Sequence, residues 1–200
     1  MAESALKRFL TDLKQDGLAR TAHRAWFRIR RVHKFFVYRM DLAERVPDFP
    51  PPLGYSLREV PLGDLPKIRE GRENLPSEFY RDQVTRENRC FGAFLGEDPA
   101  FFTWISAEGI QPEFVPLRPG DVEQDFSYCR ETHRGKKLLN VTTTFVAKQL
   151  QREGKNALWT HVHEDNVASI KGVLQAGFKQ VGVVKRWIAF TWKDEGSWTL

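Results

Sequence analysis

A short basic stretch that contains one glycine, RGKKLLN at residues 134–140, carries the strongest chemical signal in the chain. It lies between an expected strand and an expected helix. Backbone N–H groups and the positive end of a helix dipole converge at such a turn, which suits a phosphate or pyrophosphate group. Arg134, Lys136 and Lys137 add side-chain charge there. The same arrangement also occurs in α/β proteins without a ligand, so this stretch does not identify a site by itself.

Carboxylates on the preceding strand, which we expect at residues 122–129, could supply a general base. Strict alternation places this strand's residues on two faces, one with Glu123, Asp125, Ser127 and Cys129, the other with Val122, Gln124, Phe126 and Tyr128. Glu123 and Asp125 are the base candidates, or else ordinary solvent-facing carboxylates. On a neighbouring strand, His161 or His163 could relay a proton. We expect no metal site, because this His-x-His pair has no cysteine nearby.

The elements that must position these residues follow from periodicity and turn signals. Strands are expected at 33–40, 55–60, 90–95, 100–106, 122–129 and 157–163, with a long final strand or hairpin at 178–192. Helices are expected at 63–68, around 78–86, at 137–153 and from residue 165 or 166 to just before Gly177. This order predicts a layered α/β or α+β sheet.

Four prolines within residues 46–54 mark the best domain boundary, because proline lacks the N–H that strands and helices need. We expect a basic helical N-terminal extension with a Pro-rich linker at residues 1–50 and one domain at residues 51–200.

The spacing of landmarks in this domain resembles the GCN5-related N-acetyltransferase (GNAT) superfamily. In that family an Arg or Gln opens a pyrophosphate loop, and a helix, a strand, an Asn, a short helix and a Gly-Phe pair follow. The matching residues here are Arg134, Gly154, Asn166, Gly177 and Phe178. The segment YSLREVPLGDLPKI at 55–68 looks like the family's first strand and helix. The resemblance covers about residues 54–192 and implies a mixed, mainly antiparallel central sheet flanked by helices.

The resemblance also implies where acetyl-CoA, or another acyl-CoA, would bind. Backbone groups of Tyr128, Cys129 and Arg130 would bind the pantetheine amides, and an amide near Cys129 could stabilise the oxyanion. Asn166 and Ser169 match positions that contact the pantetheine arm. The pyrophosphate would be held by the amides of Arg134, Gly135, Lys136, Lys137, Leu138 and Leu139.

Three residues depart from the family pattern. Lys137 and Leu139 replace the second and third glycines of the loop. Either Lys137 adopts an ordinary φ and contributes charge, or the cofactor site is damaged. Val173 stands where a tyrosine often protonates the leaving thiolate. Tyr128 is a substitute acid, or else a core aromatic residue.

Composition and charge limit the classes of protein and of partner that remain possible. The 200 residues are 41% hydrophobic and 28% charged, which argues against disorder, and the apolar runs are too short to span a membrane. Residues 1–40 hold ten Lys and Arg against three acidic residues, a net charge of +7, whereas the rest carries −2. This basic arm could pack on the domain, contact an anionic membrane surface or dock an acidic protein. Because no base-reading motif is present, we expect no specific nucleic-acid recognition.

We therefore expect a cytoplasmic acyl-CoA-dependent N-acyltransferase, at most peripheral to a membrane, most simply an N-acetyltransferase. It would transfer the acyl group to a primary amine of a small molecule or peptide by direct attack in a ternary complex. Two alternatives remain. One is a GNAT-fold binding or regulatory module that has lost turnover, and the other is an acyltransferase that uses an acyl carrier protein docked by the arm.

Overall fold

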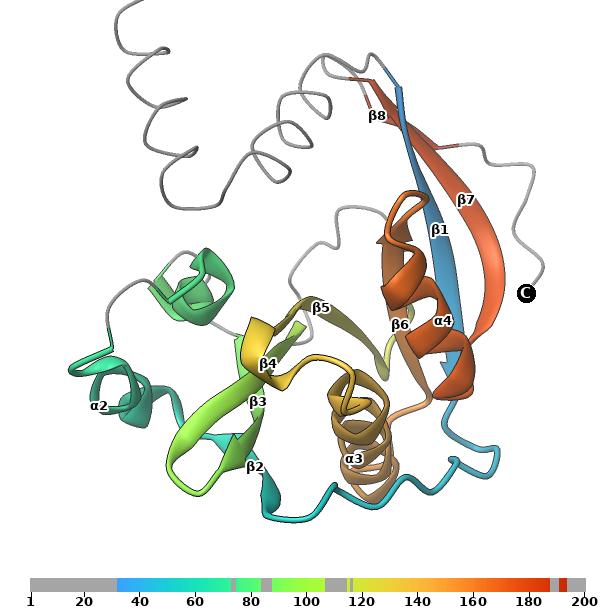
Figure 1. Cartoon of the computed structure of the whole chain (residues 1–200). Coiled ribbons are helices and arrows are strands. Elements are labelled where there is room, and N and C mark those ends of the chain that lie inside the picture. Colours follow the sequence, from blue (N-terminus) through green and yellow to red (C-terminus); the bar gives the residue numbers. More distant parts are fainter. Residues whose placement is uncertain are drawn as a thin grey trace, which may run out of the picture.

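The computed structural model describes residues 32–72, 75–83, 88–106, 115, 117–187 and 191–193. The expected helical part of the arm therefore lies outside the described residues. Within the described part, eight strands form one sheet in the order β2-β3-β4-β5-β6-β1-β7-β8 (Figure 1). The strands are β1 (Val32–Asp41), β2 (Tyr55–Val60), β3 (Asn88–Leu95), β4 (Asp98–Ser106), β5 (Asp121–Cys129), β6 (Ala157–His163), β7 (Lys179–Trp187) and β8 (Thr191–Lys193).

Every pair of neighbouring strands is antiparallel except β5 and β6, which are parallel. This pattern confirms the predicted mixed, mainly antiparallel sheet. The expected C-terminal strand or hairpin is the β7–β8 pair. Parallel neighbours need a long crossover, and residues 130–156, which include α3 (Leu138–Arg152), provide it between β5 and β6.

The helices cover the two faces of the sheet unequally. α3 and α4 (Val167–Gln175) share one face, where Val146 and Leu150 of α3 pack with Phe91, Ile105 and other residues of the sheet. The opposite face of β2–β5 is covered by α2 (Leu65–Arg69), which follows a 3₁₀ turn at Leu62–Asp64, and by the 3₁₀ segment Ser77–Gln83. The helix expected around 78–86 is therefore a 3₁₀ segment in its described part, with a kink at Tyr80. None of the described helices is long and apolar enough to cross a membrane.

β1 lies inside the sheet, between β6 and β7. Tyr38 and Met40 point into the core under α3 and α4, and Val37 packs on the other face with Trp159. Residues 32–41, which we expected in the N-terminal extension, are thus part of the domain. The Pro-rich segment is likewise joined to it: Val46 belongs to the core, and Lys148 of α3 pairs with Asp48. The prolines lie beyond the end of β1, in the connection to β2, and do not separate two domains.

Candidate active site

A β-bulge in the middle of β5 shapes the candidate site. Asp125 pairs with Trp104 of β4 and Tyr128 pairs with Phe102, so Phe126 and Ser127 together face Thr103. Phe126 has a φ of 50°, and its N–H donates to Oδ1 of its neighbour Asp125 (2.6 Å). An extra residue in one strand bends that strand and shifts the alternation of every side chain after it.

The bulge overturns the expected division of β5 into two faces. Gln124 donates to Thr143 of α3 (3.0 Å), so it lies on the α3 face. Ser127 hydrogen-bonds Thr103 on that same face (2.7 Å), and Cys129 packs with Leu138. The predicted grouping of Glu123 and Asp125 with Ser127 and Cys129 is therefore wrong. Beyond the bulge it is Tyr128, which packs on Phe79, that shares the opposite face with the two carboxylates.

β5 and β6 diverge just before the bulge. Their pairing covers Asp121–Glu123 against Ala157–Trp159, after which β5 stays with β4 and β6 stays with β1. The N–H of Arg130 bonds the carbonyl of Ala100 (2.9 Å). Because bonded and non-bonded pairs alternate in an antiparallel ladder, Cys129 points its own N–H and C=O away from β4, into the opening.

Glu123 lies where the two strands part. Its side chain is 4% exposed, and its Oε1 is 3.0 Å from Nδ1 of His161 on β6. Phe35 of β1 contacts the same imidazole edge to face. We call the point where β5 and β6 part, with Glu123 and His161, the vertex. A buried carboxylate paired with an imidazole can accept a proton there. Asp125 differs, because its carboxylate already caps the bulge through the N–H of Phe126.

The segment that leads into α3 presents a run of backbone donors. The first backbone bond of α3 runs from the N–H of Val141 to the carbonyl of Lys137 (3.1 Å). The N–H of Arg134, which we expected to bind the pyrophosphate, instead donates to the carbonyl of Glu131 (3.2 Å). In the described part of the chain, no oxygen accepts from the next six amides, those of residues 135–140. Gly135 and Lys137 have φ values of 78° and 58°, whereas the φ of Lys136 between them is not positive. Alternating backbone signs turn successive N–H groups toward one point, the geometry of an anion-binding nest.

A buried polar network fixes the start of this segment. The hydroxyl of Tyr55 lies 2.7 Å from Nδ1 of His133, and Nε2 of His133 lies 3.4 Å from Asp98. Burial by itself would raise the pKa of Asp98, but Arg130, which donates to it (2.6 Å), and His133 together lower this pKa. Both backbone groups of Arg130 are also bonded, to Ala100 and His133. Arg130 therefore anchors the loop and does not offer the free backbone group that we expected.

Sequence reasoning missed this network because its members are distant in the chain and no pattern in the sequence links their side chains. Burial also raises the pKa of the Cys129 thiol, only partly offset by Arg134. A thiol with a raised pKa is a poor nucleophile.

Comparisons with known proteins bear on the fold. No protein-family model and no curated protein matches the sequence. Among solved structures, a tandem GNAT protein from the clavulanic acid biosynthesis pathway is 21% identical over 78% of this chain, with a TM-score of 0.52. The chain has the GNAT fold. A GCN5-related N-acetyltransferase from Sphaerobacter thermophilus (17% identity, 84% of this chain) and an acetyltransferase from the GNAT family of Colwellia psychrerythraea (12%, 80%) both reach 0.53.

This chain spans only about half the length of these three GNAT structures, covering 52%, 56% and 56% of them. The likeness therefore concerns the architecture, and the site has to be judged on its own residues.

The structure places all three residues that depart from the GNAT pattern, two of them in the loop and Val173 in α4. Lys137 adopts the left-handed conformation that glycine would have, so the ordinary φ that we considered is not realised. Leu139 points away from the amides and packs so closely on α4 that a Cβ at Gly172 would lie 2.5 Å from its Cδ2. Val173 is buried in the core. Neither Leu139 nor Val173 therefore obstructs the run of amides.

Asn166 and Ser169 lie at the start of α4. Oδ1 of Asn166 accepts from the N–H of Ser169 (3.2 Å), so Asn166 is the N-cap of this helix. Asn140 joins α3 to α4 by donating to the carbonyl of Gly172 (2.9 Å). The contact of Asn166 and Ser169 with a pantetheine arm stays a prediction.

Proposed function

We propose that this chain is an acyl-CoA-dependent N-acyltransferase, most simply an N-acetyltransferase, that transfers its acyl group to a primary amine by direct attack. The observation that carries the proposal is the run of six amides at residues 135–140, which have no acceptor in the described part of the chain. One residue of this run, Leu138, packs with Cys129 at the end of β5, next to the opening between β5 and β6. These amides and the dipole of α3 would bind the pyrophosphate. The backbone of Cys129 would pair with the pantetheine.

The residues of the opening support a direct transfer. An alkylammonium must lose a proton before its nitrogen can attack, and Glu123 with His161 would accept it at the vertex. The new C–N bond replaces the C–S bond, and the leaving thiolate takes up a proton. Tyr128 is the proposed donor, because the bulge places it on the face of Glu123.

Calorimetry with acetyl-CoA tests the binding half of the proposal. Gly135→Pro removes one amide and cannot adopt the φ of 78°, so we expect at least roughly tenfold weaker binding. Gly71→Pro is the matched control, because Gly71 also has a positive φ, of 68°, and lies outside the loop. Equal affinity in the wild type and Gly135→Pro, with folding intact, would place the cofactor elsewhere.

Release of the free thiol over a panel of amines tests turnover. Glu123→Gln keeps the size of the side chain but cannot take a proton, so kcat should fall about 100-fold with unchanged acetyl-CoA affinity. Glu97→Gln, at a largely exposed carboxylate of the β3–β4 turn, is the control. Tight binding of acetyl-CoA without thiol release from any amine would instead favour the binding module without turnover.

A further inference from the structure

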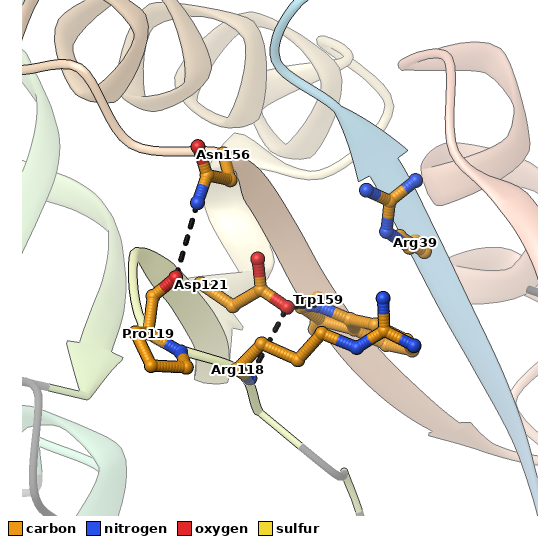
Figure 2. A pocket seen from close by; sticks show the side chains of 6 residues that line it. All are labelled: Arg39, Arg118, Pro119, Asp121, Asn156 and Trp159. Atoms are coloured by element: carbon orange, nitrogen blue, oxygen red, sulfur yellow. Dashed lines mark hydrogen bonds between the residues drawn. The ribbon is translucent and has the colours of Figure 1, made fainter.

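A cavity of about 290 Å³ opens on the sheet face opposite α3, where β5 and β6 begin (Figure 2). Trp159 and Asp121 are almost fully buried there, and Nε1 of Trp159 donates to Oδ2 of Asp121 (2.9 Å). The same carboxylate oxygen accepts from the N–H of Arg118 (3.3 Å). The lining residues are Arg39, Arg118, Pro119, Asp121, Asn156 and Trp159.

The cavity is aligned with the proposed catalytic vertex. Asp121 and Trp159 each precede by two residues a member of the Glu123–His161 pair, on the same two strands. Residues two apart in a strand share a face and lie roughly 7 Å apart. An elongated ligand on this face could therefore occupy the cavity with one end and reach Glu123 with the other.

Two guanidinium groups give the cavity its chemistry. Arg39 enters from β1, with its Cζ 5.8 Å from the centre of the Trp159 ring, and Arg118 comes from the segment before β5 (Figure 2). Arg39 donates to Asp41 at 3.2 Å through one of its five N–H groups. In the described part of the chain, no acceptor contacts the guanidinium of Arg118. With Asp121 the lining carries a net positive charge, which suits a carboxylate or another anion.

The phosphates of an acyl-CoA are not the natural occupant. The cavity lies at the first residue of β5, whereas the amides that lead into α3 follow its last residue. The nine residues of β5 separate these two ends by roughly 26 Å. The anion that this cavity fits therefore belongs to the other substrate.

We propose that this cavity binds a carboxylate of the acyl acceptor, so that the acceptor is an amine with a carboxylate at its far end. This inference rests on the proposed function. An α-amino acid carries both groups on one carbon, so they lie closer together than the roughly 7 Å between Asp121 and Glu123 along β5. The class that fits is an ω-amino acid, or a short peptide whose terminal amine and carboxylate are similarly separated.

Binding and turnover of a matched set of probes test the inference. We expect 6-aminohexanoate to have a KM about tenfold below that of hexylamine, because only the former offers a carboxylate to the arginines. Glycine should be a poor acceptor. Arg118→Met should remove the preference, and Arg118→Glu should reverse it in favour of hexylamine. Acetyl-CoA affinity should stay unchanged in both variants. Arg45→Met, at an exposed arginine outside the cavity, is the matched control.

Calorimetry with hexanoate and the protein alone separates this inference from the proposed function. Hexanoate cannot be acylated, so its binding reports the cavity even if no turnover is found. We expect binding that Arg118→Met weakens about tenfold, with thermal unfolding unchanged because Arg118 is exposed. No binding of hexanoate, or equal binding by the wild type and Arg118→Met, overturns the inference and leaves the N-acyltransferase proposal standing. Absence of acetyl-CoA binding rejects that proposal on its own.

Discussion

Two residues of the candidate site hold a backbone conformation that side chains normally avoid. Among the described residues other than glycine, only Phe126 and Lys137 have a positive φ. Such conformations cost of order 1 kcal/mol or more and persist where the surroundings enforce them. Phe126 forms the bulge beside the opening, and Lys137 lies within the run of amides, directly before α3. Both strained positions therefore lie where the proposed acyl-CoA would contact the backbone.

Lys137→Gly should relieve this strain. Glycine adopts positive φ at no steric cost, but it also raises the entropy of the unfolded chain. Lys136→Gly also raises the entropy of the unfolded chain but relieves no strain, since Lys136 does not have a positive φ. Denaturant unfolding should therefore find Lys137→Gly more stable than Lys136→Gly by about 1 kcal/mol. Equal stabilities would mean that Lys137 is not in the left-handed conformation.

For single residues, the sequence predicted which side chains to consider for the site better than it predicted the face of the sheet on which they lie. The loop at 134–139 was predicted from a glycine and basic residues before a helix, and the carboxylate at position 123 from its place on a strand. The face of the sheet on which the side chains of Ser127, Cys129 and Tyr128 lie was predicted wrongly. A bulge centred on phenylalanine has no local signature, because the usual signals of a positive φ are Gly, Asn and Asp.

Among the elements, α3 is tied to the sheet by an arginine clamp. Arg89 of β3 makes paired hydrogen bonds to Glu59 of β2 and to Glu153 at the end of α3, at 2.7–2.8 Å. The hydrogen bond from Arg89 lowers the pKa of Glu153, against a smaller opposing effect of burial. A lowered pKa in the folded state adds stability above the unfolded value of about 4.3, and this stability is lost as pH falls through the folded value.

Arg89→Met should thus destabilise the protein in a pH-dependent way. We expect a loss of about 1 kcal/mol at pH 7, because these partly exposed bonds are weakened by solvent. The loss should shrink as pH falls below about 4, when Glu153 becomes protonated. Urea unfolding at both pH values checks this. Arg152→Met is the control, since Arg152 bonds only the neutral amide of Gln149. A loss that is independent of pH would assign the effect to packing of the arginine stem.

The elements themselves were largely predictable. Alternation in strands and the cap at Asn166 gave β2–β7, α3 and α4 nearly at their observed bounds. The strand at 33–40 was also predicted, but its partners were not. An isolated strand with apolar residues on both faces indicates burial, not a place in the sheet. The prolines after it resemble a linker in the sequence, although they lead from one side of the same sheet to the other.

At the scale of the whole molecule, the position of β1 connects the N-terminal part of the chain to the site. β1 pairs along β6, which carries His161 and Trp159. Its Phe35 contacts His161, and its Arg39 lines the cavity. Any test of the basic arm, whether against acyl carrier protein or anionic vesicles, must therefore remove residues before β1 and retain β1 itself.

Two truncated chains test this connection. A chain of residues 32–200 retains β1. A chain of residues 42–200 lacks it, so β6 and β7 have unpaired edges in the middle of the sheet. This chain also lacks Tyr38 and Met40, so the core residues that pack against them become exposed. Unpaired, apolar edges are unstable in water and promote aggregation. We expect cooperative thermal unfolding of 32–200 and none of 42–200, and a synthetic 32–41 peptide should restore part of it. Identical melting of the two chains would show that the sheet closes without β1.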